Sequence, residues 1–291
     1  MDNDYAKAGK INSQALAYAR TIAKKGAKLV DVADKIEQKI IDLGGKLACP
    51  VTLSCDHIAA HYCPEEEDET VLDNQVLKID IGVHVNGKIA DAAITIDLSG
   101  KYGDLVKAAE EARDKALAMI KPGVTLSQIG TVIQSTITKY GFAPIRNLSG
   151  HRLENFELHA SPSIPNVINA DNTKLEKGWA IAIEPFSTNG AGIIQDSDYP
   201  TIFSLVNKKP VRSPIAREVL AFIEEEYQAL PFAKRWLTKK FGKGKTALAL
   251  RELSQAGLLE AHPPLIEKNK GIVAQAEHTI FVDDKSEITT A

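Results

Sequence analysis

Two aspartates in one predicted hairpin are the clearest candidates for chemistry in this chain. Asp80 and Asp91 lie on either side of an Asn86-Gly87 turn signal, within the alternating run 77–96. A two-residue type I′ turn makes them diagonal neighbours on one face, with Cα atoms roughly 7–8 Å apart. Two carboxylates this close repel unless a cation or a shared proton lies between them, so the hairpin predicts half of a metal site. An ordinary hairpin with a solvated acidic face is the alternative.

The opposite face of the same hairpin is apolar and predicts a core. The turn sets a register that pairs Gly82 with Asp91 and Asp80 with Ala93. Residues pointing the other way then share one buried face. They are Ile79, Ile81, Val83, Ala90, Ala92, Ile94 and Ile96.

Four side chains in the second half could also bind a metal or move protons. They are His151, His159, Glu184 and Glu277. Glu184 ends a short buried-strand pattern, just before a proline that stops the ladder. A predicted strand over 271–282 places Glu277 on one side together with Gln275 and Thr279. Taken singly, such a histidine or glutamate is more often structural than functional.

An internal repeat predicts a fold made of two similar halves. Residues 24–44 align with 121–141 at a constant offset of 97, with apolar matches at helical spacing and a closing glycine. Each copy follows an alanine-rich helical stretch and precedes strand-like segments, so we expect an α/β (α+β) fold with a pseudo-twofold axis and the site between the halves. The matched pairs include Gly26 with Gly123, Leu29 with Leu126, Ile36 with Ile133, and Gly44 with Gly141.

One stretch has no counterpart in the other half. Ser213 and Pro214 form an N-cap with proline at the first helical position. Nine basic against three acidic residues lie between Lys234 and Lys270, so this region could bind RNA or the ribosome, although a solvated charged face is the more frequent meaning of such a pattern. Helix-like sequence covers 213–230, 232–240 and 246–256.

The composition indicates a soluble globular protein. Its net charge is −3, with 44% hydrophobic and 25% charged residues. The chain starts without a signal-peptide pattern, and it has no apolar run long enough to cross a membrane. Three cysteines within 49–63 do not make a disulfide framework. We therefore expect a cytoplasmic monomer that does not contact membranes.

Taken together, the candidate residues and their local sequences resemble the type 2 methionine aminopeptidases, in particular their short archaeal form. The resemblance covers almost the whole chain. It implies a pita-bread (creatinase/aminopeptidase) fold over 1–212 plus 265–291, with 213–264 as a helical insertion. The implied activity is removal of the N-terminal methionine from nascent proteins when the second residue is small. The motifs that carry the resemblance are 59–62, 78–82, 144–151, 182–186 and 274–279.

The resemblance also implies a role for each candidate residue. Two divalent ions, of Co, Mn, Fe(II) or Zn, would neutralise four carboxylates, and one imidazole would complete the shell of one ion. A pair of ions can activate water and polarise a carbonyl. Glu184 would also transfer a proton, while His61 and His159 would bind the scissile peptide and stabilise the tetrahedral intermediate. The implied ligands are Asp80, Asp91, His151, Glu184 and Glu277.

Two positions depart from the family pattern. Cys49 and Ala276 stand where relatives usually have phenylalanine, and we expect both to remove bulk beside the methionine pocket. A separate zinc site built from the cysteines and histidines of 55–63 is an alternative use of His61. Its spacing lacks the usual paired cysteines.

Two other functions are compatible with some of these residues. A prolidase or Xaa-Pro aminopeptidase shares the five ligands but carries a large domain before the first aspartate, whereas 79 residues precede Asp80 here. A non-catalytic pita-bread protein that binds the ribosome or RNA would lose ligands. Keeping buried carboxylates without a cation would be costly, which favours the enzyme.

Overall fold

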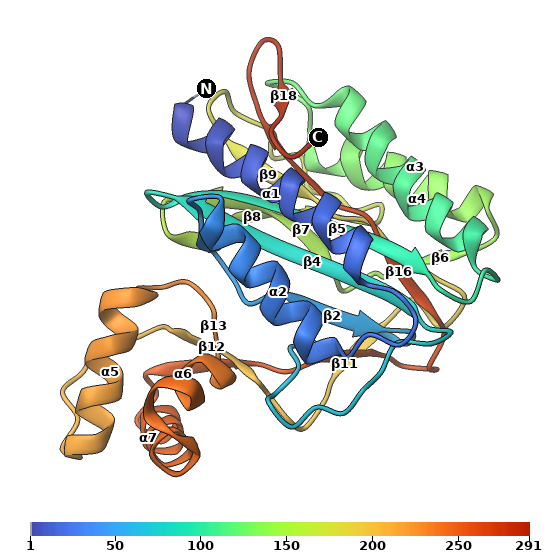
Figure 1. The fold of residues 1–291 in the computed structure, drawn as a ribbon. Helices are drawn as coiled ribbons and strands as arrows, with labels where there is room; N and C mark the ends of the chain where they lie inside the picture. Colours follow the sequence, from blue (N-terminus) through green and yellow to red (C-terminus); the bar gives the residue numbers. More distant parts are fainter. Residues whose placement is uncertain (1) are drawn as a thin grey trace.

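Two helix pairs lie outside a central layer of antiparallel strands, and a third helical group projects from one side (Figure 1). The structure is a computed structural model and describes residues 2–291. Among these residues, no helix is long and apolar enough to cross a membrane. The helices are α1 (Asn3–Ile22), α2 (Leu29–Asp42), α3 (Gly103–Met119), α4 (Leu126–Lys139), α5 (Pro214–Glu226), α6 (Lys234–Phe241) and α7 (Lys243–Gln255).

The strands form two larger sheets and three small ones. In the first half, β4 pairs with β1 and β2 on one side and with β5 on the other, and the second half contains the sheet β18-β17-β9-β7-β8. The small sheets are β16-β10-β6, β11-β15-β3 and β13-β12-β14. The strands are β1 (Lys46–Leu47), β2 (Thr52–Cys55), β3 (Ile58–Ala60), β4 (Val76–Val85), β5 (Lys88–Asp97), β6 (Ala143–Pro144), β7 (Ser149–Glu154), β8 (Glu157–Pro165), β9 (Ala180–Ile183), β10 (Phe186–Thr188), β11 (Ile194–Asp196), β12 (Ile202–Leu205), β13 (Phe232–Ala233), β14 (Leu259–His262), β15 (Leu265–Glu267), β16 (Val273–Gln275), β17 (His278–Phe281) and β18 (Glu287–Ile288).

The predicted hairpin is β4 and β5, and its register is confirmed. Gly82 pairs with Asp91 and Asp80 pairs with Ala93. The turn residue Asn86 has φ 50°, as a type I′ turn requires. The predicted apolar face packs against α1 and α2 in one buried cluster, which leaves the aspartate face turned toward the second half.

The internal repeat is confirmed at the level of single residues. Helices α2 and α4 begin and end at the same offset of 97 that relates the two sequences. Gly26 and Gly123 have φ 88° and 89°, and Gly44 and Gly141 have φ 82° and 79°. Each glycine therefore supplies a left-handed backbone conformation at the same point of its half, which a side chain would strain.

The two halves meet where β5 runs along residues 275–279. Ala93 accepts a backbone hydrogen bond of 2.9 Å from Glu277. On either side of this bond a threonine of one half bonds to the backbone of the other, Thr279 to Asp91 and Thr95 to Gln275. This antiparallel seam brings the ligand candidates of the two halves together.

The helices α5–α7 pack on the small sheet β13-β12-β14. The predicted cap is confirmed, because the Ser213 side chain accepts from Ala216 N and Pro214 begins the helix. The assignment of 213–264 as an insertion within 1–212 plus 265–291 stays a prediction. In the structure, β12 precedes that range and shares its sheet.

Several basic side chains of this region pair with acidic residues of the chain itself. Four of the five paired residues reach α2 or the acidic segment 65–67, so they hold the helices against the first half. Their positive charge is partly neutralised, which favours the structural interpretation of the basic run. The pairs are Lys234 with Glu65, Arg235 with Asp34 and Glu37, Lys239 with Asp34, Lys243 with Glu67, and Lys245 with Glu218.

One strand prediction needs correction, and one strand was missed. The predicted strand 271–282 is two strands, β16 and β17, separated at Ala276 and Glu277. Strand β8 was not predicted at all. It contains Pro162, which argues against a central strand, but β8 is the edge strand of its sheet, where a missing N–H is tolerated.

Candidate metal centre

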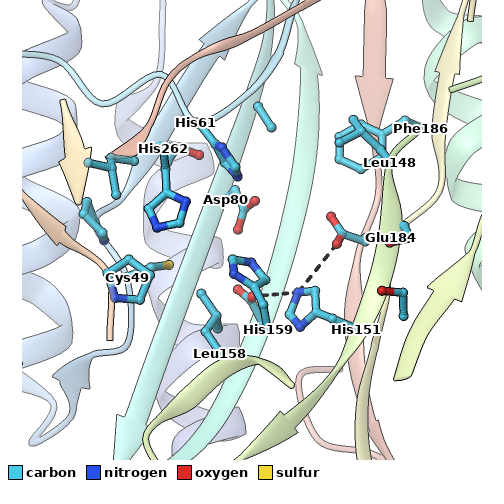
Figure 2. Close-up of a pocket in the computed structure, with 18 of the residues that line it drawn as sticks. Cys49, His61, Asp80, Leu148, His151, Leu158, His159, Glu184, Phe186 and His262 are labelled. Carbon is cyan, nitrogen blue, oxygen red and sulfur yellow. Dashed lines mark ion pairs between the residues drawn. The ribbon is translucent and has the colours of Figure 1, made fainter. Parts of the chain in front are cut away.

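The five predicted ligands lie together between the halves. Figure 2 labels Asp80, His151 and Glu184 among them. Asp80 and Asp91 come from β4 and β5, which α1 and α2 support from behind. His151 comes from β7, Glu184 follows the end of β9, and Glu277 lies between β16 and β17. The first half thus supplies two carboxylates, and the second half supplies two carboxylates and an imidazole.

The distances between these side chains are those of a ligand cluster. His151 Nε2 lies 3.8 Å from Asp91 Oδ2 and 3.5 Å from Glu184 Oε1. Potential ligand atoms of Asp91, His151 and Glu277 all lie within 4.8 Å of one another. Asp80 joins the same cluster through the amide of Gln275, which contacts both Asp80 and Glu184.

Burial makes ionisation of the cluster unfavourable when no cation is present. It raises the pKa of Asp80 to about 6. Burial, followed by repulsion from the neighbouring carboxylates, raises the pKa values of Asp91, Glu184 and Glu277 well above the usual range. Burial, together with nearby His159, also lowers the pKa of His151 well below its usual value, so its ring is neutral and able to bind a metal.

The residues fit a divalent metal. Within residues 2–291, Asp91 Oδ1 and Glu277 Oε1 are buried oxygens without a hydrogen-bond partner. Such atoms are costly to bury unless something binds them. Four carboxylates and one imidazole offer hard oxygen donors with one nitrogen, a set that suits Mn²⁺, Fe²⁺, Co²⁺ or Zn²⁺.

A cavity of about 270 Å³ opens beside the cluster. Figure 2 shows Glu184 and His151 on one side of it and Cys49 and His262 on the other. The non-ligand candidates His61 and His159 both line the cavity.

These two histidines are neutral near pH 7. Burial and the neighbouring imidazoles lower the pKa of His61 to about 3 and that of His159 to about 4. His61 also has φ 64°, a left-handed conformation that residues other than glycine seldom adopt and that often marks a functional position.

A third histidine of the cavity, His262, was missed by the sequence analysis. Its Nε2 lies 2.8 Å from Ser204 Oγ, and its ring meets that of His61 edge to face at 6.1 Å. His262 lies at the end of β14, in the region that the sequence suggested to be a surface insertion. Only the pairing of β14 with β12 brings it to the cavity, and the signal in the sequence was limited to a histidine before two prolines.

The two departures from the family pattern have different outcomes. Cys49 lines the cavity as expected. The expectation for Ala276 is wrong, because Ala276 packs in a buried cluster with Leu105 and Ala109 of α3, outside the cavity lining. Gln275 and Glu277 both face the cluster, so the residue between them points to the other side of the extended chain.

The alternative zinc site is not formed. Among residues 2–291, the only group of histidine, cysteine and acidic side chains with metal-binding spacing is that of Asp91, His151 and Glu277. Arg235 Nη1 donates to Cys63 Sγ at 2.6 Å, so this thiol belongs to the contact between α6 and the first half.

Comparisons with known proteins identify relatives of this chain. The sequence model of metallopeptidase family M24 matches residues 3–283 of this chain. A methionine aminopeptidase from Thermococcus onnurineus (strain NA1) is 46% identical over 286 residues, which cover 98% of this chain and 97% of that protein.

Solved structures support the fold. A thermophilic Arx1 superposes with a TM-score of 0.87 at 16% identity, covering 99% of this chain and 90% of that one. A methionine aminopeptidase from Thermotoga maritima gives a TM-score of 0.72 at 22% identity, covering 100% and 97%. The predicted pita-bread fold is therefore confirmed.

Proposed function

This chain belongs to metallopeptidase family M24 and, within it, to the methionine aminopeptidases, and we propose that it removes the N-terminal methionine of nascent proteins when the second residue is small. The observation that carries the proposal is the buried group of Asp91, His151 and Glu277 beside a cavity. The preference for a small second residue is what the resemblance of the sequence to the type 2 methionine aminopeptidases implies.

We further propose that the cluster holds two divalent ions. Asp80, Asp91, His151, Glu184 and Glu277 would bind them, because their charges and donor atoms match such a pair. When bound, the ions polarise the scissile carbonyl and lower the pKa of water.

Glu184 is the proposed proton carrier. It lines the cavity, and its carboxylate lies beside His151. A carboxylate at this position can accept a proton from the attacking water and pass it to the leaving amine.

The cavity histidines are proposed to bind the peptide. His61 and His159 are neutral imidazoles, each of which can donate one hydrogen bond to the carbonyl oxygen as negative charge develops there. His262 forms the facing wall and is oriented by Ser204, so it would contact the bound peptide from the side of β14.

The place of action and the partners are proposals of the same kind. We place the protein in the cytoplasm as a monomer, where translation exposes N-terminal methionine. Binding of the ribosome by the basic region 234–270 stays a prediction, and the ion pairs that join this region to α2 and to residues 65–67 weaken it.

Hydrolysis of defined peptides tests the proposed function. The protein is freed of metal and reloaded separately with Co²⁺, Mn²⁺, Fe²⁺ or Zn²⁺. Release of methionine from Met-Ala-Ser is then compared with cleavage of Xaa-Pro peptides. We expect cleavage of Met-Ala-Ser and little of Xaa-Pro. Intact Met-Ala-Ser with every metal would refute the proposal, and preferential Xaa-Pro cleavage would favour a prolidase-type enzyme.

A further inference from the structure

The amide of Gln275 lies among three carboxylates of the metal cluster. Its Nε2 is 3.2 Å from Asp80 Oδ2, 3.3 Å from Glu184 Oε2 and 3.5 Å from Glu277 Oε2. The side chain is 1% exposed. A neutral donor at this point can bond to the carboxylates without a positive charge. A lysine here would compete with the metal cations for the same carboxylates.

The backbone of Gln275 is fixed from both sides. On one side, Thr95 Oγ1 donates to Gln275 O at 2.6 Å and accepts from Gln275 N at 2.9 Å. On the other side, Gln275 pairs with Phe186 of β10. The side chain therefore starts from a rigid point between the two halves, and its amide is aimed at the cluster.

The contacts divide the carboxylate oxygens into two sets. The two N–H groups of the amide are shared among three oxygens, Asp80 Oδ2, Glu184 Oε2 and, at 3.5 Å, Glu277 Oε2, and the two glutamates each use only this one oxygen. Their other oxygens are turned elsewhere, since Glu184 Oε1 faces His151 Nε2 at 3.5 Å and Glu277 Oε1 is buried without a partner among residues 2–291. One oxygen of each carboxylate is thus restrained, and the other is left for a cation.

We propose that Gln275 is a positioning residue of the metal centre, whose amide restrains Asp80, Glu184 and Glu277 so that their remaining oxygens are presented to the cations. The inference rests on the proposed function for the presence of the ions. Residues that orient metal ligands in this way typically change metal affinity about 10–100-fold when they are removed.

The test is metal titration of Gln275→Leu, which removes the amide. Calorimetry with Mn²⁺ measures the number of ions and the Kd of each, and the visible absorption of the Co²⁺-loaded protein reports on ligand geometry. We expect at least one Kd to rise about 10–100-fold and the Co²⁺ spectrum to change. Gln134→Leu is the matched control. Gln134 lies on α4, away from the cluster, and its side chain accepts a hydrogen bond from Ile168 N. It should leave the Kd values and the spectrum unchanged.

A second variant covers the case in which Gln275→Leu does not fold. Gln275→Asn keeps the amide but withdraws it by one methylene, so it should weaken metal binding in the same direction. Unchanged Kd values and an unchanged Co²⁺ spectrum in whichever variant folds would overturn the inference. Failure of the proposed function looks different, because the unmodified protein would then bind metal and leave Met-Ala-Ser intact.

Discussion

Thr279 and Asp91 exchange two hydrogen bonds through a single hydroxyl group. Asp91 N donates to Thr279 Oγ1 at 2.8 Å, and Thr279 Oγ1 donates to Asp91 O at 2.8 Å. The second half thereby fixes the backbone of a ligand candidate in the first half.

Replacing Thr279 by valine should destabilise the protein and weaken metal binding. Valine leaves one buried N–H and one buried C=O of Asp91 without their partner, and each such group costs about 1–3 kcal/mol. Denaturant unfolding and metal titration measure the two effects. Thr279→Ser keeps the hydroxyl and serves as the control. A valine variant as stable as the serine variant would show that these bonds contribute little.

Asp91→Asn should abolish metal binding and activity together. The substitution removes one negative charge from the centre of the cluster while preserving the size of the side chain. Elemental analysis after dialysis gives the metal content, and cleavage of Met-Ala-Ser gives the activity. Two ions retained per chain would mean that Asp91 is not a shared ligand.

His61→Ala should separate catalysis from metal binding. His61 lines the cavity without belonging to the ligand group, so its loss should lower kcat by about 10²–10³ and leave the metal content unchanged. Single-turnover kinetics and elemental analysis on the same preparation decide this. Loss of metal with an unaltered rate in the remaining loaded enzyme would contradict the assignment.

His262→Ala should raise KM for Met-Ala-Ser more than it lowers kcat, because His262 forms a wall of the cavity opposite the cluster. Ser204→Ala keeps the ring but removes its hydrogen bond, so we expect a smaller change in the same direction. Steady-state kinetics on both variants gives the comparison. An effect confined to kcat would instead place His262 in the chemical step.

The metal-free protein should lose stability as the pH rises. Burial raises the pKa of Asp80 to about 6, whereas an aspartate in an unfolded chain has a pKa of about 4. The folded state then binds more protons than the unfolded state between these values, so this contribution to stability falls as the pH rises through that window.

Thermal unfolding of the metal-free protein at about pH 4 and about pH 6 measures this dependence. Asp80→Asn should reduce it without removing it, because the raised pKa values of Asp91, Glu184 and Glu277 act in the same direction. Added Mn²⁺ should reverse it, because the cation binds the ionised carboxylates. A dependence of the same size in Asp80→Asn would assign the effect to other groups.

Local signals predicted the hairpin and the repeat well. The Asn86-Gly87 turn fixes a register because side chains alternate, and the paired glycines mark points where the backbone must turn left-handed. These features depend on neighbouring residues and can be read from the sequence.

Features that depend on distant contacts were missed. The cavity position of His262 follows from the pairing of β14 with β12, and β8 tolerates Pro162 only because it lies at a sheet edge. The expectation for Ala276 was wrong for a local reason, because its neighbours Gln275 and Glu277 face the cluster and alternation turns Ala276 toward α3.

The division of the proposed ligands between the halves predicts that metal binding depends on the docking of the halves. Asp80 and Asp91 precede α3, and the other three follow α4, so a chain whose halves have not docked presents only part of the set. Such a chain should therefore bind divalent ions with lower affinity than the docked protein. A protein cut in the turn near Gly100 would regain tight metal binding only when its two fragments meet, so bound metal reports that the halves have joined.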